Sequence, residues 1–132
     1  MSKLPTIAMT PMPEFGYPDP IGMILCGEKV HTLRKQRHHN RKEITVGGKR
    51  TGIIIEFGDW ILMRQIDMTD TFARADGFIA TSVVGQIHTP SENLQWLLGH
   101  FYDDEPPKTM WCNYFRVIER PAAEGSDDET PT

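Results

Sequence analysis

The chain has 132 residues and a formal net charge of −4 at pH 7, and 39% of its residues are hydrophobic. This length suits one domain with a single core, and the apolar content excludes a disordered adaptor. Because the first residues lack an apolar signal-peptide core and no apolar run is long enough to cross a bilayer, we expect a cytoplasmic protein without a membrane partner.

Charge is distributed unevenly along the chain. Residues 28–50 contain eight basic and two acidic residues, whereas residues 121–132 contain four acidic residues and no base. A basic stretch on an otherwise acidic chain is typical of a phosphate-binding surface, but it also fits a solvated loop. The sequence leaves both readings open.

The first elements in chain order are an extended arm, a short helix and a strand. Residues 1–18 are rich in proline and predict an arm that lies over a domain formed by residues 19–120. Asp19 and Pro20 are typical of a helix start, so we expect a helix over residues 21–26 that ends at Gly27 in the left-handed conformation. A strand over residues 30–35 would place Thr32 and Arg34 on one face.

The middle of the chain alternates between polar and apolar segments. Residues 36–50 are polar and basic and predict a long exposed loop with a turn at Gly47-Gly48. Residues 52–57 and 60–66 predict two strands joined by a two-residue hairpin at Gly58-Asp59. Residues 69–75 predict one short helical turn.

The last third contains the clearest helix and a closing strand. Residues 89–92 form a capping box, and an apolar stripe follows at Leu94, Leu97, Leu98 and Phe101. Residues 109–119 predict a strand rich in aromatic side chains, and residues 121–132 predict a disordered acidic tail. These elements indicate an α+β fold, a small β-barrel or half-barrel with short helices packed on its ends.

The block from Gly27 to Arg34 reads G-x-K-x-x-T-x-R after a short apolar helix, and it resembles the signature of ASCH domains. Asp76-Gly77-Phe78, followed by an amphipathic helix, resembles the second block of that family, and residues 114–118 are similar to its end. Residues 80–88 look like an insertion between them. The resemblance implies a PUA-like β-barrel, a fold that binds RNA and modified bases.

The resemblance also implies a candidate catalytic set. Some small bacterial members are amidohydrolases that remove the acetyl group from N4-acetylcytidine with a lysine, a threonine and an acidic residue. By position these correspond to Lys29, Thr32 and Asp76, with aspartate where the hydrolases have glutamate. A threonine hydroxyl needs a base to become a nucleophile, and Lys29 serves as that base only as a neutral amine in an apolar pocket.

The residues expected to bind a nucleic acid or nucleoside lie mainly in the basic stretch: Gly27, Lys29, Thr32, Arg34, Lys35, Arg37, Arg41 and Lys42. Arg34 would hold a phosphate or the carbonyl edge of a base, and Asp76 would accept a hydrogen bond from an exocyclic amine. Trp60 and Trp111 are candidates for stacking a base, whereas we expect Trp96 to pack in the core.

Neither a metal nor a cofactor is expected. His31, His38 and His39 lie close together in the sequence, but no further ligands follow at a suitable spacing. Cys26 and Cys112 lack metal or redox spacing, so we expect free, buried thiols.

Three classes of function are compatible with these features: an RNA-binding or nucleoside-binding module, an amidohydrolase that uses Thr32, Lys29 and Asp76, and a regulatory protein-interaction module that uses the arm or the tail. A buried Lys29 amine within hydrogen-bond reach of Thr32 and Asp76 would favour the hydrolase. An exposed Lys29 on a basic groove would favour the binding module. The sequence determines neither the base nor the oligomeric state.

Overall fold

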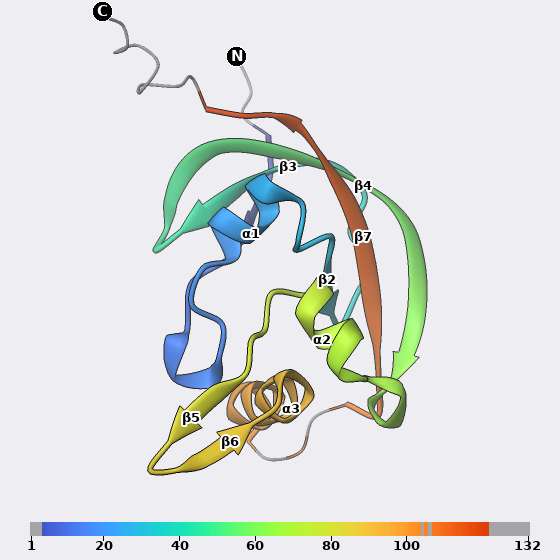
Figure 1. Cartoon of the computed structure of the whole chain (residues 1–132). Helices are drawn as coiled ribbons and strands as arrows, with labels where there is room; N and C mark the ends of the chain where they lie inside the picture. Colours follow the sequence, from blue (N-terminus) through green and yellow to red (C-terminus); the bar gives the residue numbers. More distant parts are fainter. Residues whose placement is uncertain (1–3, 104, 106, 122–132) are drawn as a thin grey trace, which may run out of the picture.

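The computed structural model describes residues 4–103, 105 and 107–121, and its main sheet is a curled half-barrel (Figure 1). The strand order is β1-β3-β4-β7-β2, in which β1 is parallel to β3 and every other pair is antiparallel. The bounds are β1 (Thr6–Ala8), β2 (His31–Arg34), β3 (Asn40–Val46), β4 (Lys49–Arg64) and β7 (Thr109–Glu119). The predicted α+β half-barrel is confirmed.

Short helices close the two ends of this sheet. They are η1 (Pro13–Phe15), α1 (Pro20–Cys26), η2 (Gln65–Asp67), α2 (Asp70–Ala75) and α3 (Pro90–Phe101). Helix α1 lies under the arch of β3 and β4, whereas α2 and α3 lie at the opposite end, where the hairpin of β5 (Thr81–Val83) and β6 (Gln86–His88) runs beside α3 (Figure 1).

The helix ends follow the predicted capping. Asp19 accepts a hydrogen bond from the Gly22 backbone N–H, and Gly27 ends α1 with a φ of 88°. Thr89 and Glu92 form the predicted capping box of α3. Local capping signals therefore place α1 and α3 correctly.

The predicted loop over residues 36–50 is wrong in its second half. Residues 40–46 form β3, which pairs with β4 through a turn at Gly47-Gly48, as expected for that turn. Ile44 and Thr45 of β3 are buried, whereas Arg41 is exposed and Lys42 is half-buried. Because its sequence is polar and basic, local polarity alone does not predict this half-buried strand.

The predicted hairpin at Gly58-Asp59 is also wrong, because β4 runs through it as one strand of 16 residues. Both halves of β4 pair with β7, and the register shifts between Phe57 and Trp60. Asp59 has a φ of 69°, so this dipeptide forms a bulge that bends the strand.

Two hydrophobic clusters form the core. One lies under the arch and contains Ile7, Met9, Ile24, Ile44, Ile53, Ile55 and Phe57. The other joins the sheet to α2 and α3 and contains Tyr17, Leu33, Met68, Ala73, Phe78, Leu94, Leu97, Leu98, Met110 and Cys112. Residues of the predicted arm thus supply β1 and buried side chains to both clusters.

Several burial predictions need correction. The leucines of the α3 stripe are buried as expected, but Phe101 is exposed. Trp96 is 53% exposed instead of packed in the core, because it lies on the outer side of α3 against Phe15. Cys112 is buried, whereas Cys26 is exposed at the end of α1, and both are free thiols.

The predicted acidic tail lies outside the described residues, apart from Pro121. Within the part of the chain that the structure describes, no helix combines the length and apolar character needed to cross a membrane.

Gly77 provides a test of the packing beside α2. It has a φ of 108°, and a Cβ there would lie 2.8 Å from Tyr17 Cε1 and 3.2 Å from Lys29 Cδ. We expect Gly77→Ala to lower the free energy of unfolding by about 3 kcal/mol, because it adds a steric clash to the cost of a positive φ. Urea unfolding would measure this loss. Gly48 serves as the control because it has a φ of 81° and open space at its Cβ position. Gly48→Ala should therefore lower the free energy of unfolding by only about 1 kcal/mol. Equal losses would contradict this account.

Candidate functional site

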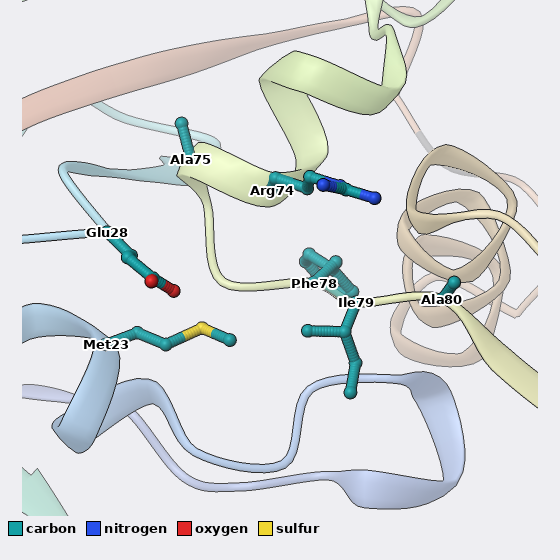
Figure 2. Close-up of a pocket in the computed structure, with 7 residues that line it drawn as sticks. All are labelled: Met23, Glu28, Arg74, Ala75, Phe78, Ile79 and Ala80. Atoms are coloured by element: carbon teal, nitrogen blue, oxygen red, sulfur yellow. The ribbon is translucent and has the colours of Figure 1, made fainter.

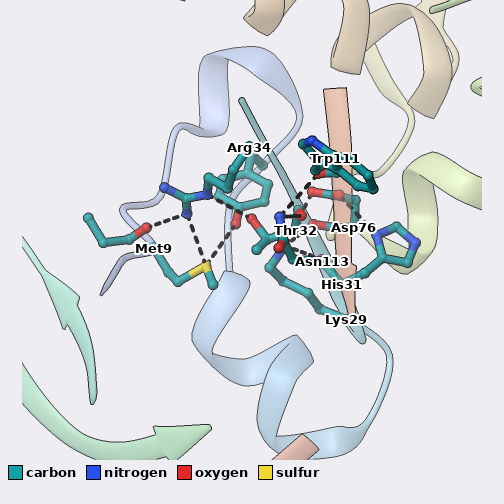
Figure 3. Close-up of polar contacts among 10 residues, drawn as sticks. Met9, Lys29, His31, Thr32, Arg34, Asp76, Trp111 and Asn113 are labelled. Atoms are coloured by element: carbon teal, nitrogen blue, oxygen red, sulfur yellow. Dashed lines mark hydrogen bonds and ion pairs between the residues drawn. The ribbon is translucent and has the colours of Figure 1, made fainter. Parts of the chain in front are cut away.

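Lys29 is buried between α1 and β2, with an exposed fraction of 1%. Its Nζ donates hydrogen bonds to the backbone oxygens of His31 (2.9 Å) and Asp76 (2.5 Å) and forms an ion pair with Asp76 Oδ1 (3.2 Å), as Figure 3 shows. These three acceptors match the three N–H donors of an ammonium group. Lys29 therefore has its hydrogen-bonding capacity filled within the protein.

Asp76 lies at the end of α2, and its carboxylate bridges two side chains. Oδ1 faces Lys29, and Oδ2 lies 3.0 Å from His31 Nδ1. The His31 ring stacks on Phe72 at 4.5 Å and meets Tyr114 edge-on at 5.1 Å. His31 is absent from the expected site, yet it helps to fix the carboxylate that belongs to it.

Thr32 and Arg34 are joined on β2. Arg34 Nε donates to Thr32 Oγ1 (3.1 Å), and Nη2 donates to the backbone oxygen of Ala8 (2.7 Å) and contacts Met9 Sδ (3.7 Å). Burial lowers the pKa of Arg34 from its usual value, and the nearby Asp76 charge opposes this shift. Nη1 has no hydrogen-bond partner within the described residues, so it can bind a ligand.

A cavity of about 600 Å³ opens beside these groups. Thr32, Arg34 and Asp76 supply charged or polar side chains to its wall. The remaining lining residues are Thr10 and a set of apolar or aromatic residues: Ala8, Met9, Met12, Tyr17, Leu33, Phe78, Leu94, Leu97, Leu98, Phe101, Tyr102 and Met110. Lys29 lies behind Asp76, and Gly27 is exposed at the end of α1; neither lines the cavity.

The other expected ligand-binding residues lie in two places. Lys35 lies over the Tyr102 ring at 5.6 Å, beside the cavity, and Arg37 lies over two indole rings. Arg41 and Lys42 are on β3, where Arg41 pairs with Glu56 and Lys42 contacts a histidine. The structure therefore brings only part of the basic stretch to the cavity.

A second cavity of about 500 Å³ lies on the other side of Phe78, which lines both. Glu28 and Arg74 are its charged lining residues, and its remaining lining residues are Met23, Ala75, Ile79 and Ala80 (Figure 2). It contains none of the expected site residues. Among the described residues, no group of three His, Cys, Asp or Glu side chains is placed to bind a metal ion.

Sequence reasoning missed the walls of the main cavity. Met9, Met12 and Tyr17 come from the segment expected to be an arm, and the α3 leucines were assigned to the core alone. The apolar residues within the proline-rich segment are the one signal that indicated burial there.

The fold is similar to two solved structures. Protein EF3133 from Enterococcus faecalis V583, of the DUF984 family, aligns with a TM-score of 0.55 and 15% identity over 83% of this chain and 73% of that one. An ASCH domain from Lactobacillus crispatus JV V101 aligns with a TM-score of 0.50 and 16% identity over 75% of this chain and 70% of that one. The chain has an ASCH-type fold. No family model and no curated protein sequence matches the chain.

In this ASCH-type fold, the Lys29–Asp76 ion pair provides a stability test. We expect Asp76→Asn to lower the free energy of unfolding by about 3–5 kcal/mol, because it leaves the Lys29 charge buried without a counterion. Urea unfolding would measure this loss. The control Glu56→Gln removes a solvent-accessible partner of Arg41 and Arg116 and should cost far less. Similar losses in both variants would refute a special role for the buried pair.

His38 provides a pH-dependent test of the β2–β3 loop. Its Nδ1 lies 2.7 Å from Lys42 Nζ, and burial, followed by the Lys42 charge, lowers the pKa of His38 from 6.5 to about 4. Between these values the unfolded chain binds more protons, so the free energy of unfolding should fall as pH decreases from 6.5 to 4. His38→Gln should reduce this dependence, and NMR should show the ring titrating near pH 4. Titration near pH 6.5 would contradict the prediction.

Proposed function

We propose that the protein binds RNA or a modified nucleoside by placing one base in the cavity lined by Thr32, Arg34 and Asp76. The observation that carries this proposal is the convergence of these three side chains on an otherwise mostly apolar, partly aromatic cavity. Its volume of about 600 Å³ lies within the usual range for small-molecule sites. The ASCH-type fold is consistent with such a role.

The polar groups suit the edge of a base that carries a carbonyl and an amine. Arg34 Nη1 donates to a carbonyl or phosphate oxygen. Thr32 Oγ1 already accepts from Arg34, so its own hydrogen is available to a base acceptor. Asp76 accepts from an exocyclic amine, and the aromatic rings of the wall contact the faces of the base. Cytosine presents this combination of groups.

The hydrolase alternative requires Lys29 to activate Thr32. Lys29 is buried and contacts Asp76, but its three hydrogen bonds go to Asp76 and His31. Thr32 Oγ1 instead accepts from Arg34, and no Lys29–Thr32 hydrogen bond occurs in the described structure. This arrangement supports recognition more strongly than amide hydrolysis.

Binding of single nucleosides tests the proposal. We expect cytidine or N4-acetylcytidine to bind in calorimetric titrations, and Arg34→Ala to weaken binding by roughly tenfold or more, since it removes a charged hydrogen-bond donor. The control Arg116→Ala makes the same charge change on an exposed side chain of β7 and should leave binding unchanged. Unchanged affinity in Arg34→Ala, for both nucleosides and RNA, would refute the proposal.

The same samples separate binding from catalysis. After incubation with N4-acetylcytidine, we expect chromatography to recover the nucleoside intact. Release of cytidine by the parent protein, lost in Thr32→Ala, would instead assign the amidohydrolase activity to this site.

A further inference from the structure

Arg37 is a positively charged side chain held by aromatic rings. Its guanidinium carbon lies 5.1 Å from the centre of the Trp111 ring and 5.7 Å from that of Trp60. It makes no hydrogen bond or ion pair to any residue in the part of the chain that the structure describes. A guanidinium has five N–H donors, so Arg37 is positioned by cation–π contacts while its donors stay available.

Hydrogen bonds attach the loop that carries Arg37 to the sheet. Asn113 is completely buried, and its side chain accepts from the His38 backbone N–H (2.7 Å) and donates to the Gln36 backbone oxygen (3.2 Å). Trp60 Nε1 donates to the His38 backbone oxygen (2.8 Å). These bonds hold the backbone on both sides of Arg37 without a ligand.

The two indoles form one surface on β4 and β7. Trp60 lies opposite Asn113 in the strand register, two residues from Trp111, so the two rings are diagonal neighbours. Both tryptophans are half-buried, and the exposed His39 ring lies 4.8 Å from Trp60. Half-buried aromatic rings beside a free guanidinium suit stacking of a base next to a phosphate.

This surface continues directly from the main cavity. Trp111 is the cross-strand partner of Arg34, which lines the cavity, and Lys35 lies over Tyr102, another cavity residue. Residues 34–42 contain five basic residues and no acidic one. Of these five, only Arg41 has an acidic ion-pair partner among the described residues.

We propose that Arg37, Trp60 and Trp111 form a second nucleotide subsite, and that the ligand is therefore a single-stranded RNA segment instead of a free nucleoside. One base enters the cavity, Arg37 binds a neighbouring phosphate, and the next base stacks on the indole surface. This inference rests on the proposed function for the occupant of the cavity.

The test compares cytidine with single-stranded oligo-C, oligo-U and oligo-A RNA of about six nucleotides, a length within the usual site sizes. We expect at least one oligonucleotide to bind roughly tenfold or more tightly than the nucleoside. Arg37→Ala should remove most of this gain and reduce the slope of log affinity against log salt by about 0.7, the value for one phosphate contact on a single strand. Trp111→Leu should weaken RNA binding by roughly tenfold while changing the salt slope less than Arg37→Ala does.

Controls separate the subsite from the cavity and from misfolding. Arg116→Ala should retain the affinity and the salt slope, and circular dichroism should show that each variant is folded. RNA should quench tryptophan fluorescence, and Trp96→Phe should leave that quenching in place because Trp96 lies on α3.

The two proposals fail in different ways. Equal affinity for oligonucleotides and cytidine, or an oligonucleotide gain that persists in Arg37→Ala, would overturn the second subsite and leave the cavity proposal intact. Oligonucleotide binding that depends on Arg37 and Trp111 would support the subsite, even if cytidine alone does not bind and the cavity proposal fails.

Discussion

The buried ion pair between Lys29 and Asp76 is the constraint on which the rest of the site depends. The two residues are 47 positions apart, and both are almost completely removed from solvent. An isolated charge in such a place would be very costly, so each residue requires the other. A backbone hydrogen bond from Val30 to Ala75 joins the same two segments. Together these contacts hold the α1–β2 connection against the end of α2.

This arrangement explains why a carboxylate can line a mostly apolar cavity. Lys29 and His31 each contact one oxygen of the Asp76 carboxylate, and of these three residues only Asp76 lines the cavity. Arg34, which also lines the cavity, is held by the Thr32 hydroxyl and by the backbone of β1 at Ala8. The polar groups are thus fixed before any ligand arrives, which favours recognition with little cost of reorganisation.

Locally encoded features could be predicted from the sequence. The caps at Asp19 and Thr89 and the left-handed Gly27 depend on neighbouring residues alone, and the aromatic-rich segment from Thr109 to Glu119 predicted the closing strand. The strand β3 and the continuous β4 could not be predicted, because pairing with distant β7 and burial of a few side chains override the local polarity and the Gly58-Asp59 turn signal.

The candidate site also combines features that local sequence predicts with features that depend on distant contacts. Alternation along β2 placed Thr32 and Arg34 together, whereas the pairing of Lys29 with Asp76 was suggested only by family resemblance. The roles of His31 and Asn113 depend on partners far away in the sequence, and no local pattern indicates them. The cavity residues from the N-terminal segment likewise depend on contacts with residues far away in the sequence.

The most direct test of this account is an NMR titration of the protein, labelled with ¹⁵N, with cytidine. If the cavity beside the ion pair is the binding site, the largest shift changes should occur at Thr32, Arg34 and Tyr102, with the Arg34 side-chain signal among them. Changes centred on Glu28 and Arg74 would place the ligand in the second cavity and contradict the account.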